Sequence, residues 1–180
     1  MTGDIGSQQY MDMHIALGAS VMFWGRLEGR MKFLLSALTG AKPEVGHVLT
    51  ANLTVAQMLD VGLHLIDLTC TEGEAEILTP WIENVKSLNE RRNKLLHRGW
   101  EQVTKAVVAE DGSSSQVLAL AQITLRSRKR GLQFHGEEVT LAELQQWGQD
   151  ILAALGGMSS FPDRFSLKNL IRIPLTQPPN

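Results

Sequence analysis

A long run of helical periodicity near the N-terminus constrains the fold of this chain more than any other feature. Between residues 8 and 39, apolar side chains follow steps of three, four and seven residues, at Leu17, Val21, Trp24, Met31, Leu35 and Leu38. Gly40 and then Pro43 end the pattern. The pattern predicts one amphipathic helix, long enough to be the spine of a helical hairpin.

Capping boxes predict where two further helices begin. The sequence Thr-Val-Ala-Gln at 54–57 has this form, with apolar residues placed for a hydrophobic staple, and predicts a helix over 54–70. Thr-Leu-Ala-Glu at 140–143 has the same form and predicts a final helix that ends at Gly156-Gly157.

A third helix is expected between these two. Glycine and acidic residues at 72–76 indicate a break, and Thr79 followed by Pro80 is typical of an N-cap and a first helical position. The helix is then predicted over 80–97, with Gly99 as its stop.

The region that follows has strand character. Apolar runs separated by polar turns predict two or three short antiparallel strands, inserted at about 101–136. The expected fold is mainly α, an antiparallel up-and-down four-helix bundle with a small β insertion between helices three and four. We expect a single domain over 1–172 and a flexible, proline-rich tail over 173–180.

Composition limits the possible functions. The chain has 180 residues, of which 43% are apolar and 20% charged, and it contains no apolar run of the roughly 18 residues that span a bilayer. The N-terminus lacks the pattern of a signal peptide and Cys70 is the single cysteine, so a cytoplasmic protein without an internal disulfide is expected. Because the formal net charge is −2, any nucleic-acid contact must be local.

One segment has the residues of a chemical site. Arg92, Asn93 and His97 lie near the predicted end of the third helix, where Asn93 and His97 are one turn apart and share a face. Arginine keeps its proton and can hold a phosphate, whereas histidine titrates near neutrality and can transfer protons. These are the two groups needed to cleave a phosphodiester without a metal.

The pattern Arg92-Asn93-x-x-x-His97 resembles the signature of the HEPN superfamily. Proteins of that superfamily are helical bundles, commonly dimeric, and many are metal-independent endoribonucleases, including toxins of toxin-antitoxin and defence systems. The resemblance implies that Arg92 contacts the scissile phosphate, that His97 transfers protons and that Asn93 orients the histidine or binds phosphate. It also implies a homodimer and, in some systems, an antitoxin or another protein partner.

The residues after the motif also resemble a bacterial branch of HEPN-like proteins in which a strand pair follows. In that branch the pattern continues as His-x-Gly-x-Trp, whereas here Gly99 and Trp100 are adjacent, so the tryptophan comes one position early. By the resemblance, Glu28 is a possible partner of the motif arginine. We predict that RNA is bound by neighbouring side chains, namely Arg91, Lys94, Arg98 and Trp100.

Other interpretations remain open from the residues alone. The basic residues can be a solvated helix end that complements the helix dipole, and His97 can be a cap. The alternative function is a non-catalytic module that binds a nucleotide, RNA or a protein partner. Asp60, His64 and Asp67 share a helical face but are poor metal ligands without a second helix, so no metal and no cofactor are predicted. The basic cluster at 126–130 is either a solvated hairpin tip or a phosphate contact.

Overall fold

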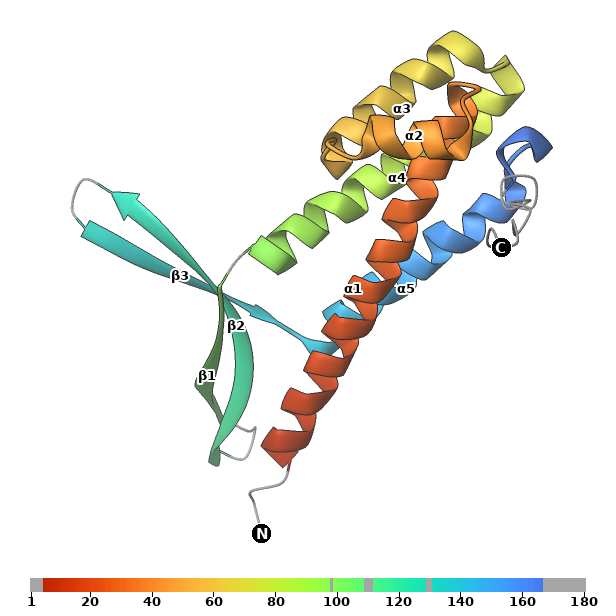
Figure 1. The fold of residues 1–180 in the computed structure, drawn as a ribbon. Helices are drawn as coiled ribbons and strands as arrows, with labels where there is room; N and C mark the ends of the chain where they lie inside the picture. The colour runs from red at the N-terminus through yellow and green to blue at the C-terminus, as the bar shows by residue number, and fades with distance from the viewer. Residues whose placement is uncertain (1–4, 98, 109–111, 129–130, 167–180) are drawn as a thin grey trace, which may run out of the picture. The chain divides into compact units, whose positions relative to one another are not determined.

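The computed structural model describes residues 5–97, 99–108, 112–128 and 131–166 (Figure 1). The described chain forms five α-helices, three strands and two short 3₁₀ segments, in the order α1 Ile5–Leu38, α2 Pro43–Thr50, α3 Val55–Thr69, α4 Glu72–His97, β1 Gly99–Val108, β2 Ser114–Arg128, β3 Gly131–Val139, α5 Leu141–Gly157, η1 Met158–Ser160 and η2 Asp163–Phe165. The prediction of a mainly helical fold is confirmed. The predicted tail at 173–180 lies outside the described residues.

The strands form an antiparallel sheet in the order β1-β2-β3. β2 is the central strand: Gly99 of β1 pairs with Ile123, and Val139 of β3 pairs with Leu120. The first part of β2 therefore pairs with β1 and the last part with β3, as Figure 1 shows. The sheet spans 99–139, against the predicted 101–136.

The chain divides into two compact units, each of which is described by itself. The first unit contains residues 1–23 and 90–150, and the second contains residues 24–89 and 151–180. The prediction of a single domain stays a prediction.

The first unit has a small apolar core where α1, β3 and α5 meet. Met13, Val139 and Leu144 are buried there, and partly buried side chains pack against them, namely Ala16, Leu17, Leu95, Trp100 and Leu141. The capping box predicted for α5 is present, because the Thr140 amide donates to Glu143 Oε2 at 2.8 Å and the Glu143 amide donates to Thr140 Oγ1 at 3.2 Å. These bonds fix the start of α5 directly after β3.

The second unit has the larger core. Its most deeply buried apolar residues come from α1, α3, α4, α5 and η2, namely Leu27, Met58, Leu59, Ile66, Leu78, Val85, Ile151 and Phe165. Trp81 joins α4 to α5, because its indole nitrogen donates to the Ala154 carbonyl at 2.8 Å. The capping box predicted at Thr54 is confirmed.

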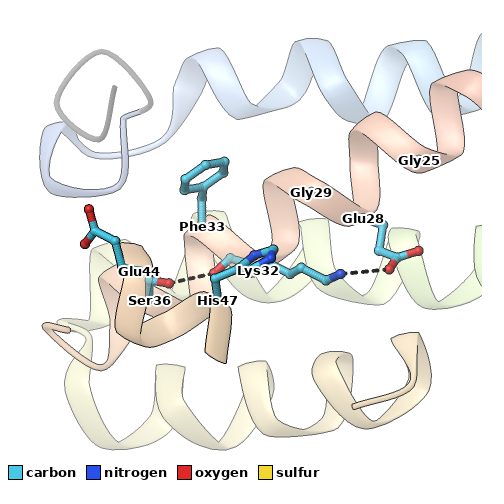
Figure 2. A pocket seen from close by; sticks show the side chains of 8 residues that line it. All are labelled: Gly25, Glu28, Gly29, Lys32, Phe33, Ser36, Glu44 and His47. Atoms are coloured by element: carbon cyan, nitrogen blue, oxygen red, sulfur yellow. Dashed lines mark hydrogen bonds and ion pairs between the residues drawn. The ribbon is translucent and has the colours of Figure 1, made fainter. Parts of the chain in front are cut away.

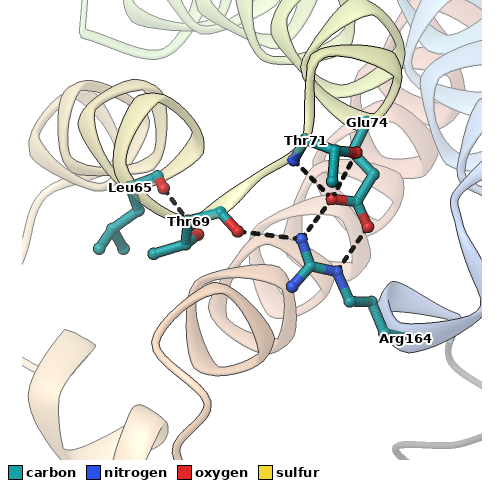
Figure 3. Close-up of polar contacts among 5 residues, drawn as sticks. All are labelled: Leu65, Thr69, Thr71, Glu74 and Arg164. Carbon is teal, nitrogen blue, oxygen red and sulfur yellow. Dashed lines mark hydrogen bonds and ion pairs between the residues drawn. The ribbon is translucent and has the colours of Figure 1, made fainter.

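In the second unit, polar contacts link Arg164 of η2 to the end of α3 and the start of α4 (Figure 3). Arg164 Nε donates to Glu74 Oε1 at 2.6 Å, and Arg164 Nη2 donates to the Thr69 carbonyl at 3.1 Å and to Glu74 Oε2. The Thr71 amide also donates to Glu74. These hydrogen bonds lower the pKa of Glu74, and the bond from Arg164 has a larger effect than the bond from the Thr71 amide.

The start of α4 differs from the prediction. The helix begins at Glu72, and Pro80 lies inside it, so the predicted start at Pro80 is wrong. Thr71 and Glu74 form the hydrogen bonds of an N-terminal cap. The acidic side chains of the first turn also interact favourably with the positive end of the helix dipole. Pro80 removes one amide donor, but Pro80 and Glu76 are both exposed, so water can bind the Glu76 carbonyl.

Two further differences concern α1 and α2. The sequence patterns do not predict α2, in which Pro43 occupies a first-turn position and Gly46 packs on α1. A Cβ at Gly46 would lie 1.6 Å from Ser36 Oγ, so only glycine allows this approach of the two helices. Val21, predicted on the apolar seam of α1, is 40% exposed, because the buried face instead includes Met13 and Leu27.

Candidate functional site

The motif lies on the last two turns of α4, which ends at His97. Arg92 is half-buried and Asn93 is exposed. Arg92 Nη1 donates to Asn93 Oδ1 at 3.0 Å, so the guanidinium and the amide of consecutive residues contact each other. The His97 side chain lies outside the described residues, and its convergence with Arg92 stays a prediction.

Trp100 determines how α4 ends. Its indole nitrogen donates to the Leu95 carbonyl at 2.8 Å, and its ring packs against the apolar core of the first unit. Leu95 is in the last turn of α4, where carbonyl groups have no partner within the helix. Trp100 therefore acts as a side-chain cap that fixes the turn carrying His97. Its predicted role in stacking on a base stays a prediction.

Arg91 has a structural contact. Its Nη1 lies 2.6 Å from Asp150 Oδ2 on α5, and Gln146 Nε2 donates to the other oxygen of the same carboxylate at 2.8 Å. A phosphate contact by Arg91 would therefore compete with Asp150. Lys94 is exposed, whereas Arg98 lies outside the described residues. RNA binding by these cations stays a prediction.

Glu28 has a contact on its own helix. Its Oε1 lies 3.1 Å from Lys32 Nζ, one turn further along α1 (Figure 2). Glu28 is thus paired with Lys32 in the structure. Its pairing with the motif arginine, Arg92, stays a prediction.

Asp60 and His64 of α3 contact other protein groups. Asp60 Oδ1 lies 3.1 Å from Lys86 Nζ, and His64 Nδ1 is 2.7 Å from the Asp60 carbonyl. Among the described residues, no three or more His, Cys, Asp or Glu side chains are arranged to hold a metal ion. The basic cluster at 126–130 lies outside the residues whose side chains are described.

A cavity of about 590 Å³ is present in the second unit, and sequence reasoning did not predict it (Figure 2). Most of it is formed by α1, and α2 contributes two residues; its lining is Gly25, Glu28, Gly29, Lys32, Phe33, Ser36, Glu44 and His47. The sequence signal that could have found it is the pair Gly25 and Gly29, one helical turn apart in a long helix. We call this cavity the glycine pocket.

Comparison with known proteins does not assign the chain. No family model matches it, and no curated protein or solved structure is significantly similar to it. Within the described residues, no helix is long and apolar enough to cross a membrane.

Proposed function

We propose that this chain is a cytoplasmic, HEPN-type endoribonuclease that needs no metal ion, with Arg92 and His97 in its site. The observation that supports the proposal is the Arg92–Asn93 contact, at 3.0 Å, on the last turns of a helix that ends at His97. In the proposed site the His97 side chain turns toward this pair, so that a permanent cation and a polar amide lie beside the group that transfers protons.

In the proposed reaction the RNA supplies its own nucleophile. The 2′-hydroxyl attacks the adjacent phosphorus after losing its proton, and the 5′-oxygen leaves after gaining one. His97 takes part in these proton transfers, and Arg92 stabilises the charge on the phosphate. The products are a 2′,3′-cyclic phosphate and a 5′-hydroxyl. A homodimer, and a role as a toxin or defence effector with an antitoxin or other protein partner, belong to the same proposal.

The test is incubation of RNA with the purified protein in EDTA, followed by analysis of the new ends. We expect cleavage by the wild type, and a loss of about 10²- to 10⁴-fold in rate for His97→Ala and about 10²- to 10³-fold for Arg92→Ala. Matched controls are the exposed residues His64 and Arg26, whose alanine variants should cleave like the wild type.

The same experiment separates catalysis from binding alone. A non-catalytic module would bind RNA with an affinity that falls as salt increases, yet no 5′-hydroxyl ends would appear. Full activity of the His97→Ala protein at pH 7 would show that the proposed proton transfer is wrong.

A further inference from the structure

The glycine pocket has the size and surface of a small-molecule site. All the residues that line it belong to the second unit, and its volume of about 590 Å³ is within the range of ligand pockets, about 300–1,000 Å³. A Cβ built at Gly25 or at Gly29 would meet no other atom within 4 Å, so the backbone of α1 forms an open floor. Phe33 adds an aromatic ring to the lining (Figure 2). The pocket can therefore take a molecule with an apolar body.

The positive charge in the lining already has a partner. Lys32 Nζ lies 3.1 Å from Glu28 Oε1, and the two side chains are only 23% and 33% exposed (Figure 2). The Ser36 hydroxyl is also engaged, because its Oγ donates to the Lys32 carbonyl at 2.9 Å. An anion that entered the pocket would have to compete with Glu28 for the ammonium group of Lys32.

The polar side chains that α2 contributes have no such partners. Glu44 and His47 are three residues apart, on one face of α2, and both line the pocket. Within the part of the chain that the structure describes, neither side chain makes a hydrogen bond or an ion pair (Figure 2). A carboxylate binds a cation, and a nitrogen of a neutral imidazole can accept a hydrogen bond from an ammonium group. The charge in the lining that is left without a partner is therefore negative.

The sequence around α2 has the same sign of charge. The segment 43–85 contains no Lys or Arg and seven acidic residues, namely Glu44, Asp60, Asp67, Glu72, Glu74, Glu76 and Glu83. Two of these acids are paired with cations outside the segment, Lys86 and Arg164, and the others leave an excess of negative charge. Arg26 and Arg30 of α1 are not among the residues that line the pocket. A field of this sign favours the approach of a cation over that of an anion.

We propose that the glycine pocket binds a small organic ammonium ion, a molecule with one protonated amino group on an apolar body. The ammonium group binds Glu44 and His47, and the apolar body covers the backbone floor at Gly25 and Gly29 beside Phe33. Such a ligand adds a partner where the lining lacks one and leaves the Glu28–Lys32 ion pair intact. The proposal concerns the second unit alone and does not depend on ribonuclease activity.

The test uses three probes with the same phenylbutyl body and a different charge at pH 7. They are 4-phenylbutylamine, which is a cation, 4-phenylbutan-1-ol, which is neutral, and 5-phenylpentanoate, which is an anion. Titration of the full chain, followed by NMR of its backbone amides, gives both the dissociation constant and the amides that shift. We expect the amine to shift amides of residues 25–36 and 44–47 and to bind about tenfold more tightly than the pentanoate, with the alcohol between them.

Two variants separate the charge of the pocket from its shape. Glu44→Gln keeps the size of an exposed side chain and removes its charge, so the affinity for the amine should fall about three- to fivefold and that for the alcohol should not change. Gly29→Leu puts a side chain into the open floor, and leucine favours the helix, so the protein should stay folded. This variant should bind the amine and the alcohol at least about fivefold more weakly.

The matched controls make the same chemical changes on α4. Glu83→Gln removes the charge of an exposed carboxylate, and Gly73→Leu adds a side chain in open space. Both should bind the three probes like the wild type. The proposal would be overturned if the amine failed to shift the pocket amides, if the pentanoate bound as tightly as the amine, or if Glu44→Gln bound the amine like the wild type. Because Glu44 is exposed, Glu44→Gln decides the question of charge even if Gly29→Leu does not fold.

Discussion

Trp100→Phe tests whether the end of α4 is held by the indole of Trp100. The change removes the donor that lies 2.8 Å from the Leu95 carbonyl but keeps an aromatic ring in the core of the first unit. The net loss of one hydrogen bond is about 0.5–1.5 kcal/mol, and the smaller ring leaves some apolar contacts unmade. Because the bond is only partly buried, water can replace part of it. We therefore expect the free energy of unfolding to fall by about 1–2 kcal/mol.

The control for this variant is Trp81→Phe. Trp81 Nε1 donates to the Ala154 carbonyl, also at 2.8 Å, but this bond is buried and belongs to the second unit. Urea unfolding should therefore show a larger loss for Trp81→Phe, about 2–3 kcal/mol. If the proposed ribonuclease site is correct, RNA cleavage by the folded protein should fall only in Trp100→Phe. Unchanged stability of Trp100→Phe would refute the capping argument, and equal effects of the two variants on cleavage would refute its link to the site.

Two further results are expected. In a double-mutant cycle of Arg91→Ala and Asp150→Ala, the coupling free energy should be no more than about 1 kcal/mol, because both side chains are more than a third exposed; a larger value would show that the pair is buried in solution. Hydrogen bonds from the Thr140 amide and hydroxyl lower the pKa of Glu143 below its usual value of 4.5. The ionised Glu143 side chain therefore stabilises the fold fully above pH 4.5, and this stabilisation is lost as the pH falls through the lowered pKa. Wild type should therefore lose more stability than Glu143→Gln in acid, and parallel pH curves would contradict this.

The parts of the fold that could be predicted from sequence have local causes. The capping boxes at Thr54 and Thr140 satisfy backbone amides within four residues of chain, so their form alone locates the helix starts. The helical period of the first helix likewise identifies Trp24, Met31, Leu35 and Leu38, all of which are buried.

The two errors have different causes. The start of α4 has a local signal, because Thr71-x-x-Glu74 has the form of a capping box and the Thr71 amide donates to Glu74, but Gly73 and the later Thr79-Pro80 point to a start further along the chain. Arg164, from a distant part of the chain, also binds Glu74. For residues 43–50, the close packing of Gly46 on Ser36 holds a short helix against α1, and this contact is not visible in a short sequence window.

The motif alone locates the candidate site in the sequence, but it does not reveal the contacts that the neighbouring side chains make within the fold. The sequence suggests that Arg91 is a ligand of phosphate, whereas the structure shows it paired with Asp150, more than fifty residues further along the chain. The sequence predicts that Trp100 binds RNA by stacking, and in the structure its indole nitrogen donates to the Leu95 carbonyl. A motif gives residue types and spacing, but only the fold shows which of them already have partners.

The most direct test of the central claim uses two short RNAs that differ by a single oxygen at the cleaved position. One carries the normal ribose and the other a 2′-deoxyribose, and both are incubated with the wild type and with His97→Ala in EDTA. We expect the wild type to cleave only the all-ribose RNA, leaving a cyclic phosphate and a 5′-hydroxyl, and His97→Ala to be slower by about 10²-fold or more. Equal cleavage of the two RNAs by the wild type, or unchanged cleavage by His97→Ala, would contradict it.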